Sequence, residues 1–253
     1  MVTVLTDTLR AWGRFGIFTG QIGLRLLTPP WFFGSVIEQT WMTCSRCLGP
    51  VIAVNFPFGS VLALQGLVIF DLFGAQRLLS SLVSVAVLRE LAPVLASVLV
   101  AAQGGSSCAA ELGAMRIKEE LDATEVMAID GLRLHAMPRV IALTIAAPTL
   151  YVFGAVAGLA GSYLTAVIVK GEPAGVFLNE LWLLTAPIDV WAGVLKTTVF
   201  GAVIGLIAAF HGYYASGGAA GVGRAVNQTV VRSVLAFITI NYLLTSALYG
   251  APG

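Results

Sequence analysis

Residues 89–131, RELAPVLASVLVAAQGGSSCAAELGAMRIKEELDATEVMAIDG, decide how this chain folds, because they place a charged, helix-favouring segment between two long apolar runs. Ten of the 27 charged residues lie between Glu111 and Arg139, whereas the stretch from Val140 to Val169 contains none. An uncharged apolar run of about 18 or more residues is long enough to cross roughly 30 Å of hydrocarbon. The pattern predicts a charged segment held at the ends of membrane-spanning helices.

The composition of the whole chain points the same way. Hydrophobic residues make up 58% of the 253 residues and charged residues only 11%, against roughly 25% charged residues in a soluble domain. The net charge of +1 gives no basic excess that would indicate a nucleic-acid partner. We expect one membrane domain over residues 1–253, with no cleaved signal peptide because no short apolar core and cleavage site follow Arg10 and Arg14.

Apolar runs predict an all-α protein with five spans. We expect spans one and two within residues 47–110 and spans three to five within 132–253, with approximate bounds 47–70, 78–110, 140–169, 190–211 and 231–249. The second run is too long for an upright helix, so it must tilt, kink at Pro93 or protrude. A loop over 170–187 and a glycine-rich turn over 216–223 are expected to separate the last three spans.

The first 46 residues are expected to form helices at the membrane surface. Over residues 3–28, apolar side chains alternate with Arg10, Arg14 and Arg25, as in an amphipathic helix lying in the headgroup layer. An ordinary N-terminal helix packed on the bundle is the alternative. Pro29 and Pro30 are expected to end this helix, and a second interfacial stretch over 31–46 leads into span one.

The distribution of lysine and arginine predicts the orientation. Ten of these residues precede span one or lie between spans two and three or spans four and five, while only Arg77 and Lys170 lie on the opposite side. By the positive-inside rule, the N-terminus and the 111–139 segment are cytoplasmic and the C-terminus is outside.

Segment 111–131 is expected to be a helix that contacts a soluble partner. Ile117, Leu121, Thr124 and Ala128 follow helical spacing among charged residues, and Gly131 is placed to end the helix. A narrow apolar stripe of this kind suits a groove on a partner, although a solvated loop helix has the same pattern. The residues expected at the contact are Glu111, Arg116, Ile117, Glu119, Leu121, Asp122 and Glu125.

Several blocks of sequence resemble the MlaE/YrbE permeases, the membrane subunits of MCE-type ABC lipid transporters. The highly specific block runs from Arg89 to Asp130 and contains Ala110-Glu-Leu-Gly113 and Glu119-Glu-Leu-Asp-Ala-Thr-Glu-Val-Met127, with Leu88 directly before it. The resemblance extends to Leu62-Ala-Leu-Gln65, His211-Gly-Tyr213 and Gly221-Val-Gly-Arg224. The resemblance implies an N-terminal elbow helix, five spans, a dimer with a second identical or paralogous permease, a coupling helix seated on a cytoplasmic ATPase, and extracytoplasmic MCE-domain partners. It places the chain in the cytoplasmic (inner) membrane of a bacterium.

The resemblance also implies an apolar lipid cavity at the dimer centre. Its lining would be Leu62, Gln65, Ile69, Phe73, Glu90 and Leu91. One departure is Gln103, where proteobacterial relatives often carry an arginine, and the uncharged residue is similar to the actinobacterial YrbE branch.

Charged residues inside the apolar runs are functional candidates by default. Arg89 and Glu90 interrupt span two, and a structural ion pair is the alternative to a functional site. Lys196, in span four, is expected either to neutralise Glu90, to meet a lipid headgroup or to reach the membrane surface.

We expect no cofactor and no metal in this chain, because ATP and Mg²⁺ would bind the partner ATPase. Lys196-Thr-Thr198 lacks the glycine-rich loop of a phosphate site. Cys44 and Cys47 have metal-ligand spacing, but Cys108 with either histidine, His135 or His211, completes no credible set.

The sequence therefore predicts a permease subunit, not itself an enzyme, that moves a hydrophobic lipid of the phospholipid, fatty-acid or sterol class between the cytoplasmic membrane and an MCE carrier. A proton-coupled secondary transporter acting through Glu90 and a lipid-modifying membrane enzyme are the alternatives. The identity of the lipid, the direction of transport and the identity of the dimer mate stay open at this stage.

Overall fold

The computed structural model describes residues 2–28 and 32–250, and over these residues the chain is helical with no strand. Five helical segments are long and apolar enough to cross a membrane in the described part of the chain. They are α2 (Phe33–Phe73), the run Gln76–Ile117, the run Leu132–Val169, α9 (Pro187–Tyr213) and α10 (Gly218–Tyr249). The predicted all-α membrane fold is confirmed.

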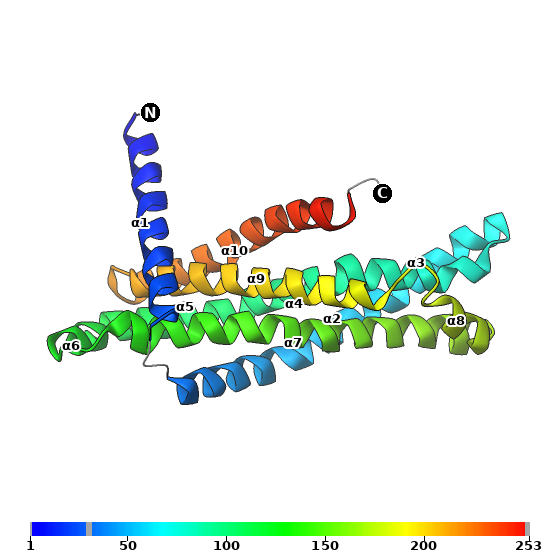
Figure 1. Cartoon of the computed structure of the whole chain (residues 1–253), viewed down its shortest axis with the longest axis horizontal. Coiled ribbons are helices and arrows are strands. Elements are labelled where there is room, and N and C mark those ends of the chain that lie inside the picture. The colour runs from blue at the N-terminus through cyan, green and yellow to red at the C-terminus, as the bar shows by residue number, and fades with distance from the viewer. Residues whose placement is uncertain (1, 29–31, 251–253) are drawn as a thin grey trace.

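The spans form an elongated bundle, and α1 (Val2–Leu26) lies crosswise to its long direction (Figure 1). If the spans cross the membrane, α1 runs along its surface, as expected for the elbow helix. Phe18 of α1 is fully buried and its ring lies 5.6 Å from that of Phe210 near the end of α9. The proposed helix ends, Pro29 and Pro30, lie outside the described residues.

The predicted second interfacial stretch over 31–46 is not a separate helix. From Phe33 it is continuous with span one in the single 41-residue helix α2, which contains Pro50 and Pro57. At 1.5 Å per residue such a helix is about 60 Å long, so one end must extend beyond the hydrocarbon or the helix must tilt. Its first turns carry exposed Phe33, Ile37 and Trp41.

The second span is segmented by wide helical turns. It consists of the short 3₁₀ turn η1 (Gln76–Leu78), α3 (Leu79–Ala86), the π turn η2 (Val87–Leu91), α4 (Ala92–Leu99), the π turn η3 (Val100–Gly105) and α5 (Ser106–Ile117). The turn η2 ends directly before the α4 turn that contains Pro93, the residue at which a kink was predicted. Proline disturbs helical hydrogen bonding upstream of itself, which accounts for the wider turn at this position.

The predicted coupling helix over 111–131 is wrong in its bounds. Residues 111–117 belong to α5 and extend span two, the chain breaks at Lys118 and Glu119, and the separate helix α6 covers only Glu120–Val126. Glu119 and Ala128, which flank α6, have φ angles of 61° and 60°. These left-handed positions, rather than Gly131, turn the chain at the two ends of α6.

Gly131 does not adopt a left-handed conformation, and its lack of a side chain instead allows the chain to pass close to Thr124. Its φ is −60°, but an added Cβ would lie 3.1 Å from the Thr124 hydroxyl. From Gly131 the chain enters η4 (Leu132–Ala136), α7 (Met137–Tyr163) and η5 (Leu164–Val169), so span three begins before the predicted residue 140.

The remaining connections are more helical than predicted. The loop over 170–187 contains α8 (Ala174–Glu180). Residues 218–223 of the predicted glycine-rich turn belong to the start of α10, which follows left-handed Gly217. Spans four and five therefore extend to Pro187–Tyr213 and Gly218–Tyr249, beyond their predicted bounds.

The bundle is centred on α7, and the most extensive contact between two helices joins α7 to α2. Glycines allow this approach: a Cβ added to Gly59 would lie 1.9 Å from the Gly158 carbonyl oxygen, and one added to Gly161 would lie 2.1 Å from that of Phe56. Small residues let membrane helices approach closely and make van der Waals contacts. These contacts matter because the hydrophobic effect does not favour association of helices within lipid.

Candidate functional site

The predicted cavity residues of span one share one face of α2, and much of that face is uncovered. Leu62 is half-buried and Gln65 is exposed, while Ile69 and Phe73 are 54% and 78% exposed. Leu62 and Leu91 pack against the same buried cluster, which also contains Leu67 and Leu88. None of the six predicted residues lines the two pockets described below. Their uncovered side chains form an open apolar face rather than a closed cavity within one chain.

Glu90, on the second span, belongs to a network that joins three spans. Lys196 of α9 is fully buried, and its Nζ donates to Glu90 Oε1 at 2.9 Å, to the Arg89 carbonyl oxygen at 2.9 Å and to Thr245 Oγ1 at 2.7 Å. Asn241 Nδ2 donates to Glu90 Oε2 at 2.9 Å, and Thr245 Oγ1 donates to Oε1 at the same distance. Of the three roles open to Lys196, neutralising Glu90 is therefore the one that the structure shows.

Asn241 and Thr245 are site residues that sequence reasoning missed. They are four residues apart on α10, and Tyr249 follows four residues later, so the three share one helical face. A polar pair at this spacing in an apolar span is the signal that could have found them, since polar side chains in a membrane seek protein partners.

Arg89 has a partner of its own at the same end of the bundle. Its Nε and Nη2 each lie 3.1 Å from a carboxylate oxygen of Asp189, and its guanidinium carbon lies 4.5 Å from the centre of the Tyr249 ring. Arg89, Asp189 and Tyr249 belong to the wall of a pocket of about 550 Å³ whose rim carries exposed Trp182, Leu184 and Ile188. Arg89 and Glu90 thus form two separate ion pairs, Arg89 with Asp189 and Glu90 with Lys196.

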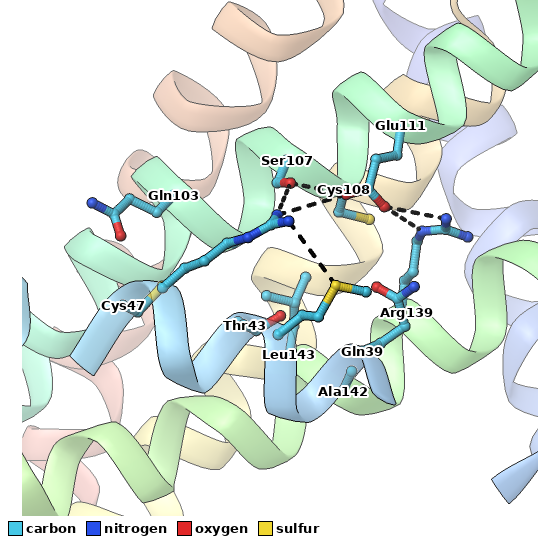
Figure 2. A pocket seen from close by; sticks show the side chains of 13 residues that line it. Gln39, Thr43, Cys47, Gln103, Ser107, Cys108, Glu111, Arg139, Ala142 and Leu143 are labelled. Atoms are coloured by element: carbon cyan, nitrogen blue, oxygen red, sulfur yellow. Dashed lines mark hydrogen bonds and ion pairs between the residues drawn. The ribbon is translucent and has the colours of Figure 1, made fainter. Parts of the chain in front are cut away.

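At the opposite end of span two, Glu111 belongs to an interhelical network (Figure 2). Its carboxylate accepts from Arg139 Nη2 at 3.2 Å and from Ser107 Oγ at 3.0 Å, and Ser107 also accepts from Arg46 at 3.0 Å. The space that these side chains line is about 20 Å³, enough for about one water molecule. Within the chain, Glu111 ties α5 to α7 and to α2, and its predicted contact with the partner stays a prediction.

Two of the four residues of the apolar stripe predicted to face a partner, Leu121 and Thr124, point into the chain instead, whereas Ile117 and Ala128 are exposed. Leu121 is fully buried and Thr124 is 9% exposed, while Ile117 sits on α5 and is 40% exposed. Tyr213, at the end of α9, donates a 3.0 Å hydrogen bond to Glu125. The stripe anchors α6 because a seven-residue helix cannot hold its own shape in water.

The surface that α6 leaves free is a different one. Val126, Met127 and Ile129 are 88%, 62% and 42% exposed, and Glu119 and Glu120 are exposed beside them. Arg116 forms an ion pair with Asp122 across the break between α5 and α6. The name α6 tip is used below for Val126, Met127 and Ile129.

The end of this segment is tied to α1. Arg25 pairs with Asp130, whose Oδ1 also accepts from the N–H groups of Leu132 at 3.1 Å and Arg133 at 3.3 Å. Burial raises the pKa of Asp130, but the hydrogen bonds from Arg25 and from the backbone outweigh it, so the pKa lies below its usual value. Arg133 Nη2 donates to the Thr28 hydroxyl at 2.6 Å. The surface helix and the α6 segment therefore form one connected unit.

Comparison with known proteins gives a consistent family match. The model of the family described as Permease MlaE matches residues 36–247. A probable ABC transporter permease protein of Rickettsia bellii is 36% identical over 237 residues, which cover 94% of this chain and 92% of the relative. The intermembrane phospholipid transport system permease protein MlaE of Haemophilus influenzae is 32% identical over 248 residues, 97% of this chain and 94% of the relative.

A third relative comes from a plant. The chloroplastic protein TRIGALACTOSYLDIACYLGLYCEROL 1 of Arabidopsis thaliana is 30% identical over 237 residues, which cover 94% of this chain and 68% of that protein. These matches span the α2 face, the Glu90 network and the α6 segment, because they extend over nearly the whole chain.

Proposed function

Because the chain belongs to the MlaE permease family, and is thus a permease of an ABC transporter whose ATP is hydrolysed by a separate subunit, we propose that it moves a membrane lipid. The substrate would be a hydrophobic lipid of the phospholipid, fatty-acid or sterol class, exchanged with an extracytoplasmic MCE carrier. The printed name of the Haemophilus influenzae relative, which specifies phospholipid transport, supports the choice of a lipid. The membrane would be the cytoplasmic membrane of a bacterium.

The observation that carries this proposal is the α6 tip. The short helix α6 lies beyond the apolar part of span two. It buries Leu121 on its inner face, but Val126 and Met127 are exposed at its end. Exposed apolar side chains on a rigidly anchored element mark a protein contact, and the family assigns the soluble partner as an ATPase. The proposed coupling contact is therefore the α6 tip with the acidic residues Glu119, Glu120 and Glu125 around it, rather than the buried stripe.

The lipid would occupy the open face of α2. Ile69 and Phe73 are uncovered in the single chain, and Glu90 and Leu91 lie on the neighbouring span. A second permease copy placed against this face would close it into an apolar cavity. Burying apolar surface stabilises a bound acyl chain by about 25 cal/mol per Å².

The distribution of positive charge supports an orientation with the N-terminus and α6 in the cytoplasm. ATP binding and hydrolysis in the partner would displace α6, and the anchors of Leu121 and Glu125 would pass the displacement to α5 and α9. The alternative of a proton-coupled transporter receives less support, because Glu90, its candidate proton carrier, is held by Lys196, Asn241 and Thr245.

The test is a variant of the α6 tip, Val126→Asp with Met127→Asp. Full burial of a valine or methionine contributes about 1.5–3 kcal/mol, so association of the ATPase should weaken at least tenfold. The measurement is co-purification of the ATPase with the permease, together with ATP hydrolysis and lipid transport after reconstitution. Leu178→Asp, at a 53% exposed position on α8 at the other end of the bundle, should retain the ATPase. Wild-type association in a well-folded tip variant would remove the main physical support for the proposal.

A further inference from the structure

Span two loses a backbone hydrogen-bond donor at Pro93. Proline has no N–H, so it cannot serve the Arg89 carbonyl four residues earlier, as in an α turn, or the Leu88 carbonyl five residues earlier, as in a π turn. Side chains donate to both oxygens: Lys196 Nζ to Arg89 O at 2.9 Å, and Tyr151 Oη to Leu88 O at 3.2 Å. Residues of α9 and α7 thus take the place of the missing amide.

Lys196 uses all of its hydrogen-bonding capacity at this point. An ammonium group has three donors, and the three go to the Arg89 carbonyl, to Glu90 and to Thr245. The lysine side chain is fully buried whereas that of Glu90 is 40% exposed. A buried charge is tolerated only when it is paired and hydrogen-bonded, so Lys196 is committed to this arrangement.

The last third of α10, residues 238–249, is attached more weakly than the rest of the helix, since only half-buried Ile240 and Leu244 pack against the buried core there. The buried residues of α10 are Gly221, Ala225, Thr229, Ser233 and Phe237. None of the described residues from Ile238 to Gly250 is buried, and Figure 1 shows this end of α10 leaning away from α9. The polar contacts there are Asn241 and Thr245 with Glu90 and Lys196, and the Tyr249 ring over Arg89.

We infer that Lys196, Asn241 and Thr245 are positioning residues for transport. They hold the last third of α10, residues 238–249, against the π turn η2 that precedes Pro93, and they do so through Glu90. This contact is called the clamp below, and the last third of α10 is called its outer third. The polar part of this attachment consists of side-chain hydrogen bonds, and the apolar part is limited to half-buried Ile240 and Leu244 against the core, so this helix end can open more easily than the packed half of α10. Movement of span two, driven from α6, would reach the outer third of α10 through this cluster. The inference rests on the proposed function, in which α6 receives the force of ATP hydrolysis.

The experiment measures where the end of α10 lies. Spin labels replace Leu243 on α10 and Leu178 on α8, both more than half exposed, in a chain whose three cysteines are changed to alanine and which is reconstituted with its ATPase. The distance distribution is recorded for the unchanged clamp and for Asn241→Ala with Thr245→Val, a pair that leaves Lys196 and Glu90 in place. We expect the variant to broaden the distribution at least twofold in the absence of ATP.

A second pair of labels provides the matched control. Val231, in the packed half of α10, and Ile145, on α7, are both about half exposed, and their distance should not change in the variant. Lipid moved per ATP hydrolysed should fall at least fivefold while ATP hydrolysis continues, and Thr245→Ser should restore it. A merely structural role would lower both activities together and would broaden both distance distributions.

The proline part of the inference has its own test. Lys196→Met leaves the Arg89 carbonyl without its donor, and Pro93→Ala returns an amide hydrogen to the position four residues after that carbonyl. Adding Pro93→Ala to Lys196→Met together with Glu90→Gln should raise the yield of monodisperse protein at least threefold. An unchanged yield, or an unchanged Leu243–Leu178 distribution in the clamp variant, overturns the inference. Failure of the wild-type protein to move lipid would count against the proposed function alone, because the distance measurement needs no transport.

Discussion

Replacing Gly59 with alanine tests the contact on which the bundle is built. The new Cβ would lie 1.9 Å from the carbonyl oxygen of Gly158, whereas a carbon and a carbonyl oxygen in contact are about 3.3 Å apart. Helices α2 and α7 would therefore have to separate locally by roughly 1.4 Å. Because the obstructing atom belongs to the backbone, no change of side-chain rotamer can relieve the clash.

The expected cost follows from the same geometry. Overpacking a well-packed site costs about 1–3 kcal/mol, and alanine is intrinsically about 1 kcal/mol better than glycine inside a helix. Gly223→Ala, in α10, provides the control, since nothing lies within 4 Å of its added Cβ. The propensity gain applies to both helical positions and cancels, so we expect Gly59→Ala to be less stable than Gly223→Ala by about 1–3 kcal/mol.

Gly158→Ala should fall between these two variants. Its added Cβ would meet the Val87 methyl group at 3.1 Å, and a side chain can give by a few tenths of an ångström. The assay is equilibrium unfolding in mixed micelles of dodecyl sulfate and dodecyl maltoside, read as the free energy of unfolding. A Gly59→Ala protein as stable as the Gly223→Ala protein would refute the reasoning that close backbone approach, rather than helix propensity, fixes the α2–α7 pair.

Two further predictions concern orientation and the lipid face. A reporter fused after Gly253 should lie outside the cell and one inserted after Ala128 should be cytoplasmic, because five spans separate the termini and the lysines and arginines gather on one side; reporters on the same side would contradict five crossings. A photocrosslinker at Ile69 should capture lipid more efficiently than one at Val156, an equally uncovered position on α7 at 54% against 63% exposure, and equal capture would mean that the α2 face is ordinary membrane-facing surface.

The spans were predictable because the bilayer imposes a simple rule on sequence. Long uncharged runs such as Val140 to Val169 have no other stable placement, and the five spans and the all-α fold follow from them. The pairing of Glu90 with Lys196 was among the alternatives considered, since two opposite charges in apolar spans favour a common location. The partners Asn241 and Thr245 were missed because single polar residues carry little signal without a known neighbour.

The segment around α6 shows where pattern reasoning fails. Leu121 and Thr124 have the spacing of an apolar stripe whether the stripe faces a partner or the chain's own core, and only the position of Tyr213 and its neighbours decides between them. The break at Glu119 was also hidden, because a left-handed glutamate has no sequence signature of the kind that glycine provides. The sequence was sufficient to predict which face of α2 carries the proposed lipid-binding residues. It could not show how that face is closed, since closing it requires a second molecule.

The two left-handed residues that flank α6 give this segment a mechanical property. A left-handed conformation costs about 1–2 kcal/mol for a residue with a side chain, and Glu119 and Ala128 both bear it. Leu121, Glu125 and Asp130 hold the geometry against that cost through contacts on either side of the bend. A rotation of α6 that returned either residue to the right-handed region would therefore release about 1–2 kcal/mol. Under the proposed coupling through α6, this energy would add to the work obtained from ATP.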